Sequence, residues 1–271
     1  MKKRNNSVLL SAPYIIFMVV FTLIPLGVVG YYALTDPDTG AFTLSNLLEL
    51  GTYLPVLGKS VLYALISSAI CLVLGYPVAY YIAHRKPLTQ KILYMLVMLP
   101  MCMSFLLRTL AWVGLLQDTG IINNLLEAVG IGRLKLIRTP AAVVLGMVYN
   151  YLPYMILPLY ATLVKLDNRL IEAAEDLGCR PVQTFAKVIL PLSVPGILSG
   201  ITMVFVPAVS TFYISQKLGG TDTVLIGDLI ERLFKQADNP NLGAALSLVL
   251  MALVFVCTGI MNRFGGDEEG V

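Results

Sequence analysis

Six long apolar stretches alternate with short polar stretches along the chain. Each apolar stretch is long enough to cross a lipid bilayer as a helix, which takes about 20 residues. They cover residues 8–32, 61–83, 92–116, 141–164, 194–215 and 242–261. These stretches lack the alternating pattern, about 10 residues per strand, of a membrane β-barrel, and backbone groups in lipid must be paired within the structure. The pattern therefore predicts an all-α integral membrane protein, a single domain over residues 1–271 with six transmembrane helices.

Composition supports a membrane location. Hydrophobic residues make up 57% of the chain and charged residues only 13%, which is far from the average of soluble domains. The net charge of +3 does not indicate a nucleic-acid partner, because the basic residues are scattered in short loops and form no contiguous stripe.

Lysine and arginine residues fall unequally on the two sides of the predicted spans. Eleven lie on the side of the N-terminus: Lys2, Lys3, Arg4, Arg85, Lys86, Lys91, Lys165, Arg169, Arg180, Lys187 and Arg263. Seven lie on the opposite side: Lys59, Arg133, Lys135, Arg138, Lys217, Arg232 and Lys235. Because basic loops stay in the cytoplasm, we expect a multi-pass protein of the bacterial inner membrane with both termini in the cytoplasm.

A polar segment, residues 165–191, separates the fourth and fifth apolar stretches. Residues 170–177 are good helix formers with an apolar face and an acidic face, which predicts a short amphipathic helix. Gly178 follows where a helix end favours a residue that tolerates the left-handed conformation, and Pro181 suits the first turn of a second helix. The segment is therefore predicted to fold as helix, turn, helix.

The same segment resembles the Glu-Ala-Ala loop of ATP-binding-cassette importer permeases. That pattern is Glu-Ala-Ala, three residues, Gly, nine residues, then Ile-x-Leu-Pro, and this chain departs from it only at Val188. The resemblance implies a type I importer permease fold, in which this cytoplasmic loop docks on an ATPase subunit and couples ATP hydrolysis to the membrane helices. The residues assigned to this coupling by resemblance are Glu172, Ala173, Ala174, Asp176, Gly178, Leu190 and Pro191.

Beyond the loop, most of the chain resembles the permeases of spermidine/putrescine importers. The resemblance is carried by residues 71–77, 152–155, 158–160, 165–167, 212–215, 219–220, 225–227 and 243–245. It implies a polyamine substrate and three kinds of partner: a second homologous permease, a dimer of ATP-binding subunits and an extracytoplasmic substrate-binding protein.

Aromatic side chains are the first candidates for the substrate path, because a polyamine is a flexible polycation that aromatic faces attract. Tyr149, Tyr154 and Tyr160 lie in the fourth stretch, which Pro153 and Pro158 are expected to kink. The alternative for each tyrosine is an ordinary place at the membrane interface, where tyrosine is enriched.

Three further residues are candidates near the outer side. Phe212 and Tyr213 lie close to the outer end of the fifth stretch, where by resemblance they form an outer gate or, alternatively, part of an interfacial aromatic belt. Asp228 is the candidate carboxylate for attracting substrate, with an ordinary solvated acid as the alternative.

Arg108 is the charged residue well inside an apolar stretch. We expect it near the outer face, where its guanidinium can snorkel to the interface and serve packing or helix pairing. An arginine suits an anion better than a polyamine. Related permeases carry ferric iron, sulfate-type oxyanions or phosphonates, so these cargoes stay open as alternatives.

The chain has no Gly-x-x-x-x-Gly-Lys-Ser/Thr phosphate loop. We therefore expect no cofactor on this chain, with ATP and Mg²⁺ bound by the partner subunit. His84 is the single histidine and has no flanking ligand cluster, so we expect no metal site and no enzyme activity. An ion-coupled secondary transporter is the alternative class, but it calls for acidic residues within the spans, and the predicted spans contain none.

Overall fold

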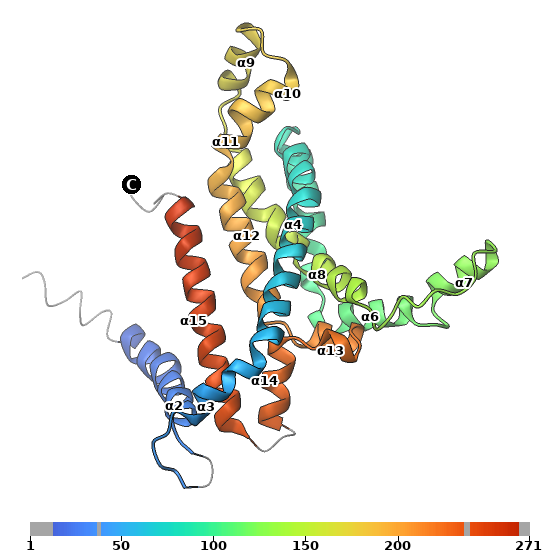
Figure 1. Ribbon diagram of the computed structural model, residues 1–271. Coiled ribbons are helices and arrows are strands. Elements are labelled where there is room, and N and C mark those ends of the chain that lie inside the picture. Colours follow the sequence, from blue (N-terminus) through green and yellow to red (C-terminus); the bar gives the residue numbers. More distant parts are fainter. Residues whose placement is uncertain (1–12, 37–38, 236–238, 266–271) are drawn as a thin grey trace, which may run out of the picture. The chain divides into compact units, whose positions relative to one another are not determined.

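The structure, a computed structural model, describes residues 13–36, 39–235 and 239–265 (Figure 1). The regular elements in these residues are helices, and one isolated bridge joins Thr35 and Phe42. Five helices are long and apolar enough to span a membrane, and a sixth candidate is a bent pair. The prediction of an all-α protein with about six spans is confirmed. The first five residues of the predicted span 8–32 lie outside the described residues.

The chain forms two compact units. The first comprises Met1–Pro55 and Leu229–Leu253, and the second comprises Val56–Asp228 and Val254–Val271. A single permease domain over the whole chain therefore stays a prediction, and each unit is described by itself.

The first unit contains the N-terminal span and part of the last one. Its elements are the π-helical turn η1 (Val19–Leu23), α2 (Ile24–Ala33), α3 (Ser45–Leu48), the 3₁₀ helix η2 (Glu49–Tyr53), most of α14 (Ile226–Lys235) and the first half of α15 (Pro240–Gly265). Ala33, Ala244 and Ala245 form a close-packed core between α2 and α15. The side-chain amides of Asn46 and Asn241 both donate to the carbonyl of Thr35, at 2.9 and 2.5 Å, and so fix the end of α2.

The second unit contains the central helices and the polar segment. Its elements are α4 (Leu54–Ala83, from Val56), α5 (Pro87–Met98), η3 (Leu99–Cys102), α6 (Phe105–Leu116), α7 (Ile121–Ala128), α8 (Pro140–Leu163), α9 (Asn168–Asp176), α10 (Pro181–Thr184), η4 (Phe185–Ile189), α11 (Leu190–Leu192), α12 (Val194–Val209), α13 (Tyr213–Leu218), η5 (Thr221–Thr223), the start of α14 and the second half of α15, from Val254. Figure 1 shows α9 and α10 at one end of α8 and α12, with α6 and α13 toward the other end.

The expected continuous helix over residues 92–116 is interrupted. Helix α5 passes into the short 3₁₀ helix η3, which contains Pro100, and the chain is extended at Met103 before α6 begins. Proline lacks an N–H donor and so weakens the helical ladder at this point. The helical stretch that is long and apolar enough to span a membrane here is Phe105–Ala128. Pro87–Cys102 forms a shorter apolar helix.

Helices α8 and α12 form the most extensive helix contact in the described chain. Two glycines of α12 permit their close approach. A Cβ at Gly196 would lie 2.6 Å from the Thr162 hydroxyl oxygen, and one at Gly200 would lie 2.6 Å from the Met155 sulfur. This small-residue pattern therefore serves packing within the chain.

Candidate functional site

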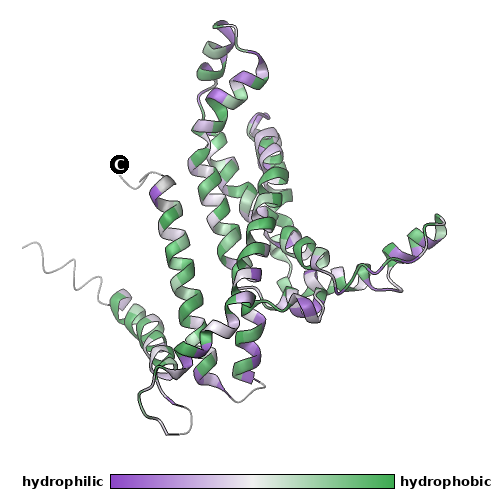
Figure 2. Cartoon of the chain, viewed as in Figure 1, coloured by the Kyte–Doolittle hydropathy of each residue, from purple (hydrophilic) through white to green (hydrophobic). Residues whose placement is uncertain are grey.

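Helix α9 (Asn168–Asp176) forms where the amphipathic pattern predicts it. Asp167 begins the helix with its carboxylate, which accepts a hydrogen bond from the Arg169 backbone N–H at 3.0 Å. An acidic cap also favours the positive end of the helix dipole. Hydrophilic residues are frequent in α9 and α10, in contrast to the mostly apolar helices α8 and α12 that lead up to them (Figure 2).

The helix ends at Gly178 in a Schellman motif. Gly178 has a φ of +82°; its N–H donates to the Glu175 carbonyl at 2.8 Å, and the Cys179 N–H donates to the Ala174 carbonyl at 3.0 Å. These two bonds pair the last carbonyls of the helix, and the left-handed conformation strongly favours glycine. The predicted role of Gly178 in the turn is confirmed.

One face of α9 carries exposed apolar side chains. Ala174 is buried, but Leu177 is 86% exposed and Leu170 is 48% exposed, with Ala173 exposed between them. Glu172 and Asp176 are also exposed. Leucines exposed to water at the tip of a polar segment indicate a surface that another protein covers.

The second part of the segment connects this tip to the membrane helices. Gln183 accepts a hydrogen bond from the Arg180 backbone N–H through its side-chain oxygen at 2.9 Å, which stabilises the start of α10. Pro181–Leu192 and Val194–Val209 meet at an angle of 64°. At this bend the buried Ser193 hydroxyl donates to the Leu190 carbonyl and is hydrogen-bonded to the Tyr76 hydroxyl at 2.9 Å. Leu190 and Pro191 therefore lie at the bend that joins the tip to α12.

The three candidate tyrosines do not share one surface of α8. Tyr149 packs edge-on against Trp112 with ring centroids 5.4 Å apart, and Tyr160 packs against Tyr94 at 5.2 Å. Tyr154 lies about 140° around the helix from Tyr149, because five residues exceed one turn of 3.6 residues. The tyrosines are brought into separate aromatic contacts, and their role in a substrate path stays a prediction.

Phe212 and Tyr213 lie just beyond the end of α12. The expected helix over residues 194–215 is interrupted at residues 210–212, and α13 starts at Tyr213. Phe212 is 42% exposed. The Tyr213 ring packs against Phe105 at 6.3 Å and against the ammonium group of Lys217 at 5.6 Å. The break separates the two rings from α12, and their role in an outer gate stays a prediction.

Asp228 is not a solvated acid. Its side chain is 2% exposed and accepts a hydrogen bond from the Gln216 amide at 2.9 Å. The carboxylate therefore attaches the start of α14 to α13, and in this conformation it does not face solvent.

Arg108 is buried, contrary to the expectation that it snorkels to the outer face. It is 5% exposed, and its Nε and Nη1 atoms have no hydrogen-bond partner among the described residues. Phe105 and Trp112, three residues before and four after it, lie on the same side of α6 and pack against Tyr213 and Tyr149. Arg108 therefore lies on the side of α6 that packs against α8 and α13.

Replacing Arg108 with methionine is expected to stabilise the protein by at least about 1 kcal/mol, because a buried donor without a partner costs about 1–3 kcal/mol and a charge costs more. Methionine has a similar length and adapts to the space. Thermal unfolding of the purified protein in detergent measures the effect, with the exposed Arg180→Met as the matched control. A lower stability of Arg108→Met than of wild type would contradict this expectation and would mean that the buried guanidinium stabilises the isolated chain.

Sequence reasoning did not single out Tyr151, the tyrosine that is most buried in α8. Tyr151 is 6% exposed, its hydroxyl donates to the Pro207 carbonyl at 3.2 Å, and it interacts with Thr211 and Arg108. The four-residue spacing from Met147 to Tyr151 and Met155 was the available signal, because these positions share one helix face.

Comparison with known proteins places the chain among transport proteins. The family of binding-protein-dependent transport system inner membrane components matches residues 71–265. The spermidine/putrescine transport system permease protein PotB of Escherichia coli is 37% identical over 86% of this chain and 88% of its own length. PotB of Haemophilus influenzae is 38% identical over 97% of this chain and 98% of its own. A molybdenum transport permease, ModB of Mycobacterium bovis, is 29% identical over 78% of this chain.

Solved structures show the same fold. A bacterial ABC transporter involved in the import of the acidic polysaccharide alginate aligns over 97% of both chains with a TM-score of 0.76 and 18% identity. The methionine ABC transporter MetNI aligns over 78% of this chain with a TM-score of 0.59. The predicted permease fold and the predicted family are confirmed. The chain belongs to the family of inner membrane components of binding-protein-dependent transport systems.

Proposed function

We propose that this chain is a permease subunit of an ATP-driven polyamine importer, in which the tip formed by α9 and α10 docks on an ATP-binding subunit. The exposed apolar face of α9 is the observation that carries the docking role. A helix that presents leucines to water gains stability when a groove on a partner covers them, at about 25 cal/mol per Å² of apolar surface. The bend at Ser193 transmits the movement of this tip to α12.

Replacing Leu177 with glutamate is expected to reduce retention of the ATP-binding subunit at least tenfold, roughly the effect of 1.4 kcal/mol of lost binding. The side chain is 86% exposed, so the substitution leaves the fold of this chain unchanged. Retention is measured by co-purification of the two subunits in detergent. The matched control is Glu175→Gln on the polar face of α9, which is expected to retain the ATP-binding subunit. Equal retention by Leu177→Glu would place the contact elsewhere.

The polyamine cargo is supported by similarity that covers nearly the whole chain. The identity of 37–38% with PotB extends over 86–97% of the chain, whereas the molybdenum permease reaches 29% over 78%. Aromatic rings at the break between α12 and α13 suit a polycation. The other proposed components are a second homologous permease, a dimer of ATP-binding subunits holding ATP and Mg²⁺, and an extracytoplasmic binding protein. Both termini are proposed to lie in the cytoplasm.

An oxyanion is the second candidate cargo. The observation that favours it is the buried guanidinium of Arg108, whose Nε and Nη1 have no partner among the described residues, together with the similarity to a molybdenum permease. An unpaired buried cation attracts an anion and repels a polyamine.

Reconstitution distinguishes the two cargoes. The chain is assembled with its ATP-binding subunits, second permease and binding protein in vesicles, and uptake of labelled spermidine, putrescine and molybdate is measured with and without ATP. We expect ATP-dependent uptake of a polyamine that molybdate, sulfate, ferric iron and phosphonates do not inhibit. Molybdate uptake by the same vesicles would retain the importer mechanism and replace the cargo. ATP hydrolysis without uptake of any of these solutes would contradict both candidate cargoes.

A further inference from the structure

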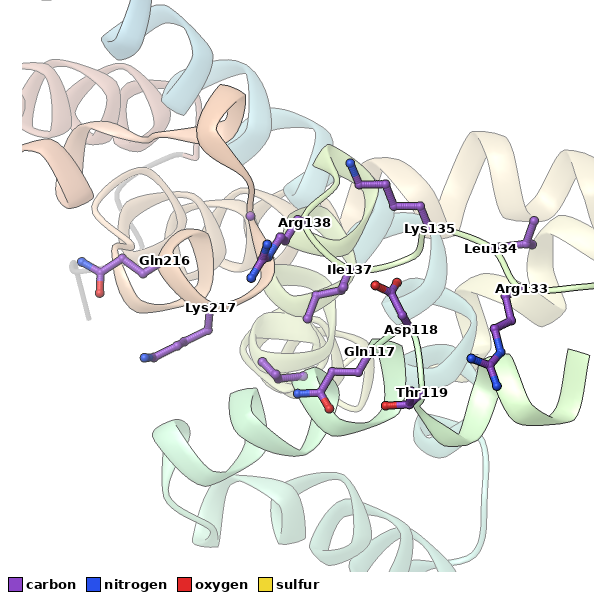
Figure 3. Close-up of a pocket in the computed structure, with 12 residues that line it drawn as sticks. Gln117, Asp118, Thr119, Arg133, Leu134, Lys135, Ile137, Arg138, Gln216 and Lys217 are labelled. Atoms are coloured by element: carbon purple, nitrogen blue, oxygen red, sulfur yellow. The ribbon is translucent and has the colours of Figure 1, made fainter. Parts of the chain in front are cut away.

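A basic pocket lies at the end of α8 opposite to α9. Its volume is about 820 Å³, and its lining comes from the end of α6, the segment before α8, and α13 (Figure 3). Four lining side chains are basic, Arg133, Lys135, Arg138 and Lys217, and one is acidic, Asp118. A pocket with this balance repels a polyamine and attracts carboxylates or other anions.

The position of the pocket relative to α8 determines the side of the membrane it faces. Arg138 comes two residues before α8, and α9 starts five residues after α8 ends. A helix of 24 residues is about 36 Å long, which is enough to cross the hydrocarbon core. If α9 contacts the ATP-binding subunit in the cytoplasm, as proposed above, the pocket opens on the outer side of the membrane.

Arg138 is held in an unusual backbone conformation at this pocket. Its φ of +60° makes it the non-glycine residue with a left-handed backbone in the described chain. The Arg138 N–H donates to the Leu218 carbonyl at 2.9 Å, and a Cβ on Gly220 would lie 2.8 Å from the Arg138 carbonyl oxygen. Strain of this kind persists only where the surroundings enforce it, and it is concentrated at functional sites. The glycine lets the segment after α13 approach closely enough to keep Arg138 in place.

A buried asparagine preorganises another part of the pocket. The side chain of Asn123 is fully buried; its amide donates to the carbonyls of Gln117 and Leu134, and its oxygen accepts from the Leu134 N–H at 2.9 Å. Gln117 and Leu134 both line the pocket. Asn123 therefore joins two lining segments that are distant in sequence, which reduces the entropy cost of binding a partner.

The positive charge of the pocket is only partly compensated within the chain. Arg133 is paired with Glu127 at 3.0 Å. Among the described residues, Lys135 and Arg138 have no ion pair within 4.0 Å, and both are exposed. Two exposed cations beside a preformed concave surface suit the carboxylates of a protein, and arginine can bind a carboxylate through two parallel hydrogen bonds.

We propose that this pocket binds acidic side chains of the extracytoplasmic substrate-binding protein when that protein docks on the permease. The inference rests on the proposed function, because it requires the pocket to face outward. It specifies where the binding protein docks and which charge its docking face carries. Lys135, Arg138 and Lys217 contact aspartate or glutamate residues on that face. The same cations keep free polyamine away from this surface, so the pocket distinguishes the protein from its cargo.

The test measures association of the binding protein with the complete transporter in nanodiscs of phosphatidylcholine. Lys135→Gln combined with Arg138→Asn is expected to lower the association rate about tenfold and to weaken its dependence on salt, because long-range attraction sets this rate. Asparagine at 138 removes the charge and tolerates the left-handed backbone, so the variant keeps the fold. Lys59→Gln, a change of one exposed outer charge outside the pocket lining, and Arg138→Lys, which keeps the charge, are expected to retain the wild-type rate.

The outcomes separate this inference from the proposed function. An unchanged association rate in the double variant, with wild-type polyamine uptake intact, would overturn the pocket assignment and leave the importer standing. A reduced rate that appears only in nanodiscs containing phosphatidylglycerol, or that inorganic phosphate reproduces in the wild type, would assign the pocket to a phosphate group instead. If the wild-type transporter neither binds the binding protein nor takes up polyamine, the proposed function itself fails.

Discussion

Replacing Gly178 with valine is expected to reduce ATP-driven uptake at least tenfold, while the chain remains in the membrane at wild-type levels. Gly178 has a φ of +82° and ends α9 in a Schellman motif. A left-handed conformation costs a residue with a Cβ about 1–2 kcal/mol, and a β-branched residue is least suited to it. About 2 kcal/mol shifts the equilibrium between the intact and the opened turn roughly thirtyfold. Uptake into vesicles and co-purification of the ATP-binding subunit measure the effect.

Gly178→Asn is the matched control, because asparagine adopts the left-handed conformation more readily than other residues with a Cβ. No heavy atom lies within 4 Å of a Cβ placed at Gly178, so steric overlap does not distinguish the two variants. We expect Gly178→Asn to retain most of the uptake. Equal loss in both variants would attribute the effect to the side chain at the docking surface, and normal uptake in Gly178→Val would remove the turn from the coupling mechanism.

The difference between predicted and observed helices follows from how proline acts in a membrane helix. Apolar length predicted the spans around α4, α8, α12 and α15. Pro153 and Pro158 lie inside the continuous helix α8, whereas Pro100 lies in a 3₁₀ helix just before the chain turns extended. A proline leaves a backbone carbonyl of the preceding turn without its helical partner, and the neighbouring helices determine whether that carbonyl finds another one. The break between α5 and α6 was therefore not readable from the apolar pattern.

The parts of the site also differ in whether contacts local or distant in sequence form them. The turn at Gly178 depends on hydrogen bonds within five residues, so its sequence was sufficient to predict it. The basic pocket combines Asp118, Arg138 and Lys217 from three separate segments, and the spacing of these residues carries no periodic signal. Arg108 likewise lies on the side of α6 whose aromatic residues pack against α8 and α13. These features required the packing of the helices.

Replacing Gly227 with alanine is expected to have the second large effect, a loss of uptake of at least tenfold with a destabilisation of about 1–3 kcal/mol from overpacking. Gly227 lies at the start of α14, and a Cβ there would be 2.5 Å from the Ser210 carbonyl oxygen and 2.7 Å from that of Thr211. Both atoms belong to the backbone at the break between α12 and α13, so the clash is not relieved by rotating a side chain. The measurements are uptake into vesicles and thermal unfolding of the purified complex.

The position of Gly227 connects this clash to the candidate gate. The neighbouring Ile226 N–H donates to the Ser60 hydroxyl at 2.7 Å, and Asp228 accepts from Gln216 at 2.9 Å. The start of α14 is therefore fixed to α4 and α13, and a shift at residue 227 moves the break that precedes Tyr213. Gly58→Ala in α4 is the control, because its Cβ meets no heavy atom within 4 Å and alanine favours the helix. If Gly227→Ala takes up substrate as well as Gly58→Ala does, the contact between residue 227 and the break does not position the gate, and the helix ends move independently during transport.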